Sequence, residues 1–180
     1  ITKTSKKKQK LKDEYNWYNN LPTELKLLTP RIVDFTEDEE NVSITMEMYG
    51  YPALSELFIL GNLSIEEWEL IVEKLFKIHK VFEKYKGTLS KKDFEDLYFN
   101  KTWNRLDDLY NQHCYWKELY NYKSIFINNK EYKNISFFKE KLNKKIKNLI
   151  DTATVSVIHG DYCFSNILFD SNSFIFRFID

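Results

Sequence analysis

Three oxygen-bearing side chains near the carboxyl end have the types and spacing that phosphoryl transfer to an alcohol requires. Asp161 follows a short apolar segment, Asn166 lies five residues later, and Asp180 ends a second apolar segment. Transfer to a hydroxyl needs one carboxylate that accepts or orients the hydroxyl proton, and oxygen ligands that hold Mg²⁺ on the nucleotide phosphates. Positioning and charge stabilisation supply most of the remaining catalysis. These residues therefore predict a phosphoryl-transfer site.

The loop that contains them resembles a known family. Residues His159 to Asn166 read His-Gly-Asp-Tyr-Cys-Phe-Ser-Asn, which has the spacing of a kinase catalytic loop and is similar to the His-Gly-Asp-x-x-x-x-Asn loop of the aminoglycoside phosphotransferase/choline kinase family. Most protein kinases have Arg where this chain has Gly160. The resemblance implies a protein-kinase-like fold and ATP-dependent phosphorylation of a hydroxyl on a small molecule, such as a sugar or an amino alcohol.

The resemblance also implies a role for each residue of the loop. Asp161 would be the catalytic base, Asn166 a Mg²⁺ ligand, and Asp180 the metal-binding aspartate at the end of a strand. His159 would hold the loop together through hydrogen bonds without taking part in the chemistry itself. The expected cofactors are ATP, or another nucleoside triphosphate, and Mg²⁺.

Upstream residues match the family's nucleotide-clamping pair. Lys3 on a strand and Glu14 on the following helix are where the family has a lysine and a glutamate that fixes it. A buried ammonium near phosphates needs such a carboxylate. Lys6 is the alternative to Lys3, and Glu24 the alternative to Glu14.

A hinge between two lobes is expected next. By resemblance, the segment Met46-Glu47-Met48-Tyr49-Gly50 is where backbone groups would meet the adenine, so Glu47, Met48 and Tyr49 are expected cofactor-binding residues. The following segments, 51–58 and 61–64, look like a subgroup associated with bacterial capsular polysaccharide biosynthesis.

The chain also departs from the family pattern. None of its four glycines precedes Lys3, so the hairpin that covers the phosphates is missing. The sequence begins at Ile1 rather than Met and stops at Asp180, directly after an apolar strand pattern. We therefore expect a fragment of a longer protein, incomplete at both ends and inactive by itself.

Hydrophobic periodicity predicts an α+β chain. A partial, strand-containing lobe over residues 1–48 is expected to precede a mostly helical lobe over 49–180. The expected strands are 1–5, 31–35, 42–48, 155–158, and two hairpins at 125–127/130–132 and 167–169/174–179. The expected helices are 6–20, 53–60, 64–85, 90–111, 113–122 and 134–150.

The strongest helical signal begins at Ser64. Ser64 and Glu67 form a capping-box pattern, and apolar residues then recur at helical spacing. This pattern predicts a buried stripe of Trp68, Ile71, Val72, Leu75, Phe76, His79 and Phe82.

The amino-acid composition limits the classes of partner that we expect for this chain. Lys and Arg together number 27, as do Asp and Glu, and this balance argues against nucleic acid as the main partner. No apolar run approaches the roughly 18 residues that a membrane helix needs, so no membrane insertion is expected. Cys114 and Cys163 lie far apart without metal-ligand spacing, which favours a reduced, cytoplasmic protein.

Two other readings stay open. A degenerate, non-catalytic kinase-like module that binds a nucleotide or a partner protein is favoured by the missing glycine-rich segment. It is disfavoured by the complete set of Asp161, Asn166 and Asp180. A helical scaffold with an accidental motif is the third reading.

Overall fold

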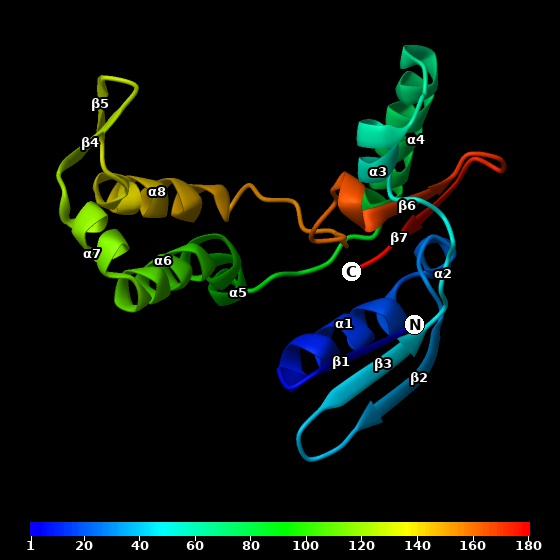
Figure 1. The fold of residues 1–180 in the computed structure, drawn as a ribbon. Coiled ribbons are helices and arrows are strands. Elements are labelled where there is room, and N and C mark those ends of the chain that lie inside the picture. Colours follow the sequence, from blue (N-terminus) through cyan, green and yellow to red (C-terminus); the bar gives the residue numbers. More distant parts are fainter. The chain divides into compact units, whose positions relative to one another are not determined.

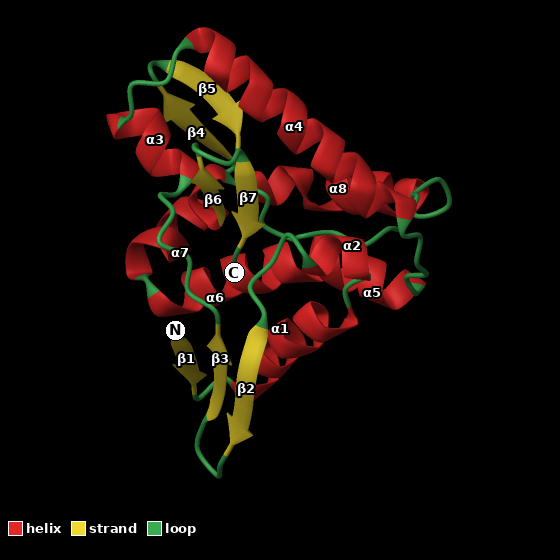
Figure 2. Ribbon diagram, turned by 90° about the vertical axis from the view of Figure 1, so that its right-hand side faces the viewer, coloured by secondary structure: helices red, strands yellow, loops and turns green.

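The computed structural model describes residues 1–180 and has two compact units. Unit 1 consists of Ile1–Tyr85 and Ser156–Asp180, and unit 2 of Lys86–Val155. Each unit combines helices with short antiparallel strands, which confirms the α+β class (Figures 1 and 2). The expected lobe boundary after residue 48 falls inside unit 1, and the division into two lobes there stays a prediction. No helix combines the length and the apolar character needed to cross a membrane.

A three-stranded antiparallel sheet opens unit 1, in the order β1-β3-β2. Its strands are β1 (Thr2–Ser5), β2 (Ile32–Glu37) and β3 (Val42–Met46). Alternation along β3 buries Val42, Ile44 and Met46, because successive side chains of a strand point to opposite faces. All three strands were predicted, and β1 sets Lys3 opposite Ile44 in the ladder.

Helix α1 (Lys8–Asn20) covers one face of this sheet (Figure 1). Leu11 and Tyr18 on α1 form a small core with the buried side chains of β3. A short helix, α2 (Thr23–Lys26), follows and was not predicted. Pro22 at its N-cap and Glu24 in its first turn are the sequence signals that mark it.

Two further helices, α3 (Leu54–Leu60) and α4 (Ile65–Lys84), follow the hinge segment as predicted. The predicted capping box of α4 is present. The Ser64 hydroxyl accepts the Glu67 N–H at 3.2 Å, and the Glu67 carboxylate accepts the Ser64 N–H at 2.7 Å.

The buried stripe of α4 differs from the prediction. Its buried side chains are Ile71, Leu75, Ile78 and Phe82. His79, expected in the core, is about half exposed and lies 3.6 Å from Glu83, and Phe76 is also exposed. The spacing of apolar residues is compatible with burial of the stripe that contains His79 or of the neighbouring stripe that contains Ile78. Packing of α4 against the hairpin at 167–178 buries the stripe that contains Ile78.

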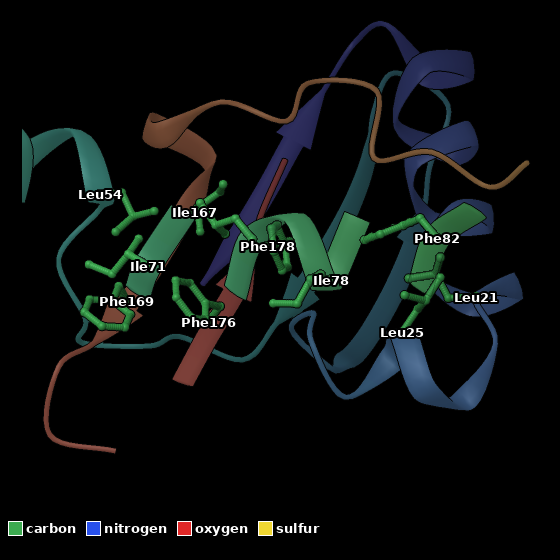
Figure 3. Packing of buried hydrophobic residues seen from close by; sticks show 11 residues of the cluster. Leu21, Leu25, Leu54, Ile71, Ile78, Phe82, Ile167, Phe169, Phe176 and Phe178 are labelled. Carbon is green, nitrogen blue, oxygen red and sulfur yellow. The ribbon is translucent and has the colours of Figure 1, made fainter. Parts of the chain in front are cut away.

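The main core of unit 1 lies between α4 and a hairpin at the carboxyl end. The hairpin joins β6 (Ile167–Asp170) to β7 (Ile175–Phe178), as predicted, with Asp170 accepting the Asn172 N–H in the turn. Its buried Phe169, Phe176 and Phe178 pack with side chains from α2, α3 and α4 (Figure 3). Asn166 directly precedes β6 and Asp180 follows β7, so the hairpin connects these two residues of the expected site.

The predicted strand at 155–158 is wrong. Ser156–Ile158 is extended but belongs to no strand ladder. The Val157 N–H donates to the Tyr85 carbonyl at 2.9 Å, and the Ile158 carbonyl accepts the Trp17 indole N–H at 3.0 Å. The segment therefore forms a single isolated β-bridge, at Ser156, and no continuous strand ladder.

Unit 2 is mainly helical. It contains α5 (Lys91–Glu95), a π-helical turn (Asp96–Asn100), α6 (Lys101–Gln112), α7 (Cys114–Asn121), β4 (Ser124–Ile127), β5 (Lys130–Lys133) and α8 (Ile135–Leu149). Asn128 and Asn129 both have positive φ, 50° and 61°, which suits a two-residue hairpin turn. The helices and the hairpin predicted here are confirmed.

Candidate active site

The loop after Gly160 is held in a tight arrangement. The Asn166 amide donates to the Asp161 carboxylate at 3.0 Å, and the Cys163 N–H donates to the Asp161 carbonyl at 2.9 Å. A 3₁₀ turn, Phe164–Asn166, covers the last part of the loop. The five-residue spacing read from the sequence thus brings the side chains of Asp161 and Asn166 into contact.

Asn166 is also tied to the end of β7. Its carbonyl accepts the Ile179 N–H at 3.0 Å, one residue before Asp180. Asp180 has a φ of 76°, a left-handed conformation that non-glycine residues rarely adopt. Such conformations concentrate at functional sites, where the surroundings hold them.

Lys3 joins α1 to this strand end. Its ammonium donates to Glu14 at 2.8 Å and also pairs with the carboxylate of Asp180. The alternatives are placed elsewhere: Lys6 lies 4.0 Å from Glu40, and Glu24 accepts the Tyr85 hydroxyl. The predicted Lys3–Glu14 pair is therefore present, and it meets a predicted metal ligand.

The charges in this cluster stabilise one another. Burial acts to lower the pKa of the Lys3 ammonium, but hydrogen bonds to Asp180 and Glu14 outweigh burial, and the pKa lies above its usual value. The hydrogen bond from Lys3 lowers the pKa of Asp180. Both groups are therefore charged at neutral pH.

A buried tyrosine completes the cluster. The Tyr18 hydroxyl accepts the Asp180 N–H at 3.1 Å. Burial and the nearby Glu14 raise its pKa to about 12, so the phenol stays neutral. In the sequence, Tyr18 shares the apolar face of its helix with Leu11, and this pattern does not reveal the contact, because it is the same whether or not the hydroxyl has a partner.

A cavity of about 370 Å³ in unit 1 gathers most of the predicted cofactor and metal residues. Lys3, Asn166 and Asp180 contribute to its wall. So do Glu47, Met48 and Tyr49 of the predicted hinge. The remaining wall is apolar and consists of Ile1, Pro30, Met46, Leu168 and Ile179. Glu14 reaches this group through Lys3, and Asp161 through Asn166.

The hinge residues differ in what they offer the cavity. The Glu47 carboxylate is occupied, because it accepts from Arg31 Nε at 3.1 Å and from the Tyr49 hydroxyl at 3.0 Å. The backbone N–H and carbonyl of Met48 make no hydrogen bond within the chain. Met48 therefore lines the cavity and has a free backbone donor and a free backbone acceptor.

The backbone conformation at Gly160 favours glycine over other residues. Its φ is +89°, and a Cβ built there would meet nothing within 4 Å. A side chain would fit in space but would be strained by the backbone, because L residues disfavour this region by roughly 1–2 kcal/mol. The glycine at this position is thus matched to the local conformation.

His159 does not hold the loop by hydrogen bonds, which corrects the expectation. Both ring nitrogens are buried without a partner. The ring instead packs edge-on against Trp17 and Phe178, with centroids 5.6 and 5.7 Å away. The sequence could not show this, because Trp17 comes from a helix far away in the chain. His159 supports the loop by aromatic packing.

We expect this packing to make unit 1 less stable in mild acid. Burial lowers the pKa of His159, against the opposing influence of Asp161. Below the pKa of about 6.5 of an unfolded histidine, the unfolded chain takes up a proton that the folded chain resists. Stability therefore falls as pH drops through that value, with a slope of at most about 1.4 kcal/mol per pH unit from one group, and this contribution vanishes above it.

Thermal unfolding of the His159→Phe and His113→Asn variants between pH 7.5 and 5.5 measures this effect. His113 is exposed and serves as the control. The first variant should lose part of the acid sensitivity, and the second should retain it. Equal pH dependence in the two variants would contradict the assignment.

Comparison with known proteins adds no relative. No family model, no curated protein and no solved structure matches the chain.

Proposed function

We propose that this chain is part of an ATP-dependent phosphotransferase that transfers the γ-phosphoryl group to a hydroxyl of a small molecule, such as a sugar or an amino alcohol. The observation that supports it best is the 370 Å³ cavity, whose wall combines Lys3 and the hinge with Asn166 and Asp180. Asp161 lies 3.0 Å from the Asn166 amide. Residues distant in sequence meet here, and their side chains are of the types that this chemistry needs.

We also propose that unit 1 is a partial protein-kinase-like fold. The sheet with α1 corresponds to a small lobe, and the core of α3, α4 and the β6–β7 hairpin corresponds to a large one. Two separate buried clusters support this division. The hinge segment lies between β3 and α3 in the chain.

The nucleotide fits the larger part of the cavity. Its volume lies within the roughly 300–1,000 Å³ typical of ligand sites. Apolar walls at Met46, Leu168 and Ile179 suit a flat base. The free backbone groups of Met48 suit the edge of that base, which carries both an acceptor and a donor.

The donors at the other end fit Mg²⁺. Asn166 and Asp180 offer an amide oxygen and a carboxylate, and Mg²⁺ is usually bound by one or two carboxylates together with substrate phosphates and water. The chain contains no group of three or more His, Cys, Asp and Glu side chains that could hold a metal without a substrate. The bound ion would neutralise charge on the phosphates.

Asp161 is suited to the acceptor. It is exposed, and of its two carboxylate oxygens only Oδ2 accepts a hydrogen bond from Asn166. Oδ1 is therefore available to accept a proton from an incoming hydroxyl. Asn166 fixes the orientation of the carboxylate, which is the positioning that general-base catalysis requires. We place this activity in the cytoplasm, where both free cysteines would stay reduced.

Mg²⁺-dependent binding of ATP tests the proposal, measured by calorimetry on the chain and on two matched variants. Lys3→Met removes the ammonium that pairs with Glu14 and Asp180, and we expect affinity to fall about 10- to 100-fold, as for the loss of a charged hydrogen bond. Lys7→Met removes an exposed lysine on the same segment and should bind normally. Absence of Mg²⁺-dependent binding, or equal affinity of the two variants, would count against the proposal.

A further inference from the structure

Unit 1 has a second cavity, of about 440 Å³, that the proposed phosphotransferase site does not use. Its wall includes Tyr18, Lys26, Arg31 and Arg177, which do not line the first cavity. Pro30, Glu47 and Tyr49 line both. The two cavities therefore share the hinge as a common wall.

The side chains around the second cavity are predominantly cationic. Lys26, Arg31 and Arg177 face a single carboxylate, that of Glu47. Glu47 already pairs with Arg31, Nε to Oε1 at 3.1 Å. Lys26 and Arg177 have no carboxylate partner within 4.0 Å in the chain. The lining therefore carries three cationic side chains and one carboxylate.

Arg177 is the most buried of these cations. Its Nη1 donates to the Phe176 carbonyl at 3.0 Å, but its Nε is buried without any partner. Its guanidinium lies over the Tyr49 ring, 5.0 Å from the centroid. Nε itself is covered, so an anion in the cavity would bind the rest of the guanidinium, which lines the cavity and has no carboxylate partner.

We propose that this cavity is a second ligand site, which binds a phosphomonoester of a small metabolite. Arginine forks match phosphate oxygens in geometry and charge. The aromatic and aliphatic side chains of Tyr18, Leu27 and Ile32 leave room for an organic body beside the phosphate. Because Tyr49 and Glu47 border both cavities, occupancy here should change affinity for a ligand in the first cavity. This proposal does not depend on catalysis.

Calorimetric titration of the chain with ribose 5-phosphate, ribose and inorganic phosphate tests it. We expect ribose 5-phosphate to bind more tightly than inorganic phosphate, and ribose not to bind. Arg177→Leu should weaken ribose 5-phosphate binding at least about 10-fold. Lys26→Ala, which changes an exposed side chain, should weaken it less and should leave the fold intact even if Arg177→Leu does not. Lys80→Ala on α4, outside the cavity, is the control for loss of one positive charge.

Three outcomes would overturn the proposal. Equal binding of ribose and its phosphate would exclude an anion site. Unchanged affinity in both Arg177→Leu and Lys26→Ala, or losses that Lys80→Ala reproduces, would exclude this cavity. Loss of ribose 5-phosphate binding in Asp180→Asn with normal binding in Lys26→Ala would place the ester in the first cavity instead.

Discussion

Replacing Asp161 with Asn is expected to lower the rate of phosphoryl transfer by about 10²–10⁴, the usual contribution of a general base. Asn preserves the size of the side chain but cannot take a proton from the acceptor hydroxyl. The Asn166 amide can still donate to the new amide oxygen, at the position where it now donates to the carboxylate at 3.0 Å. The local geometry should therefore survive, and nucleotide affinity should change little.

The measurement is ATP consumption by the full protein, first screened against a library of small hydroxyl metabolites and then repeated with the variant. Asp170→Asn is the matched control, because Asp170 accepts the Asn172 N–H in the β6–β7 turn and Asn serves equally well there. Full activity of Asp161→Asn would refute the role of the base. Mg²⁺-dependent ATP binding by the wild type without transfer to any acceptor would instead favour the non-catalytic module.

The site residues that the sequence located best are those whose role depends on local spacing. Asp161 and Asn166 belong to one loop, and the carboxylate and amide meet because a 3₁₀ turn closes the short interval between them. Lys3 and Glu14 meet because a strand and the next helix pack as neighbours. In both cases the two residues that meet belong to the same loop or to consecutive elements of the chain.

Contacts between distant segments could not be predicted in the same way. The ring of His159 packs against Trp17 and Phe178. The sequence contains many other aromatic residues, and nothing in it shows which of them would contact His159. Arg177 alternates with apolar residues along β7, a pattern that any outward-facing polar residue of a strand would also give. Its buried Nε and its position over Tyr49 depend on how the segment 46–50 packs against the β6–β7 hairpin. Only the assembled unit shows these relations.

Phe178→Ala is expected to destabilise unit 1 by about 3–5 kcal/mol, the usual range for a buried phenylalanine. Phe178 has no exposed surface and lies in the middle of the labelled core in Figure 3. Its ring stacks on Tyr162 with centroids 5.2 Å apart and contacts Phe82 edge-on. Since domains are typically stable by only 5–15 kcal/mol, this change alone would bring unit 1 close to unfolding.

The position of Phe178 links this loss to the site. One residue, Ile179, separates it from Asp180 along the chain, and its ring contacts His159 directly. Hydrogen exchange of the amides in α4 and β7 measures the stability of unit 1 separately from that of unit 2. Phe174→Ala is the matched control in the same hairpin, because Phe174 is 38% exposed and should contribute far less. A loss below about 1 kcal/mol for Phe178→Ala, or similar losses for both variants, would mean that the loop does not depend on this core. The expected difference would mean that the core beneath β7, against which His159 packs, supplies much of the stability of unit 1.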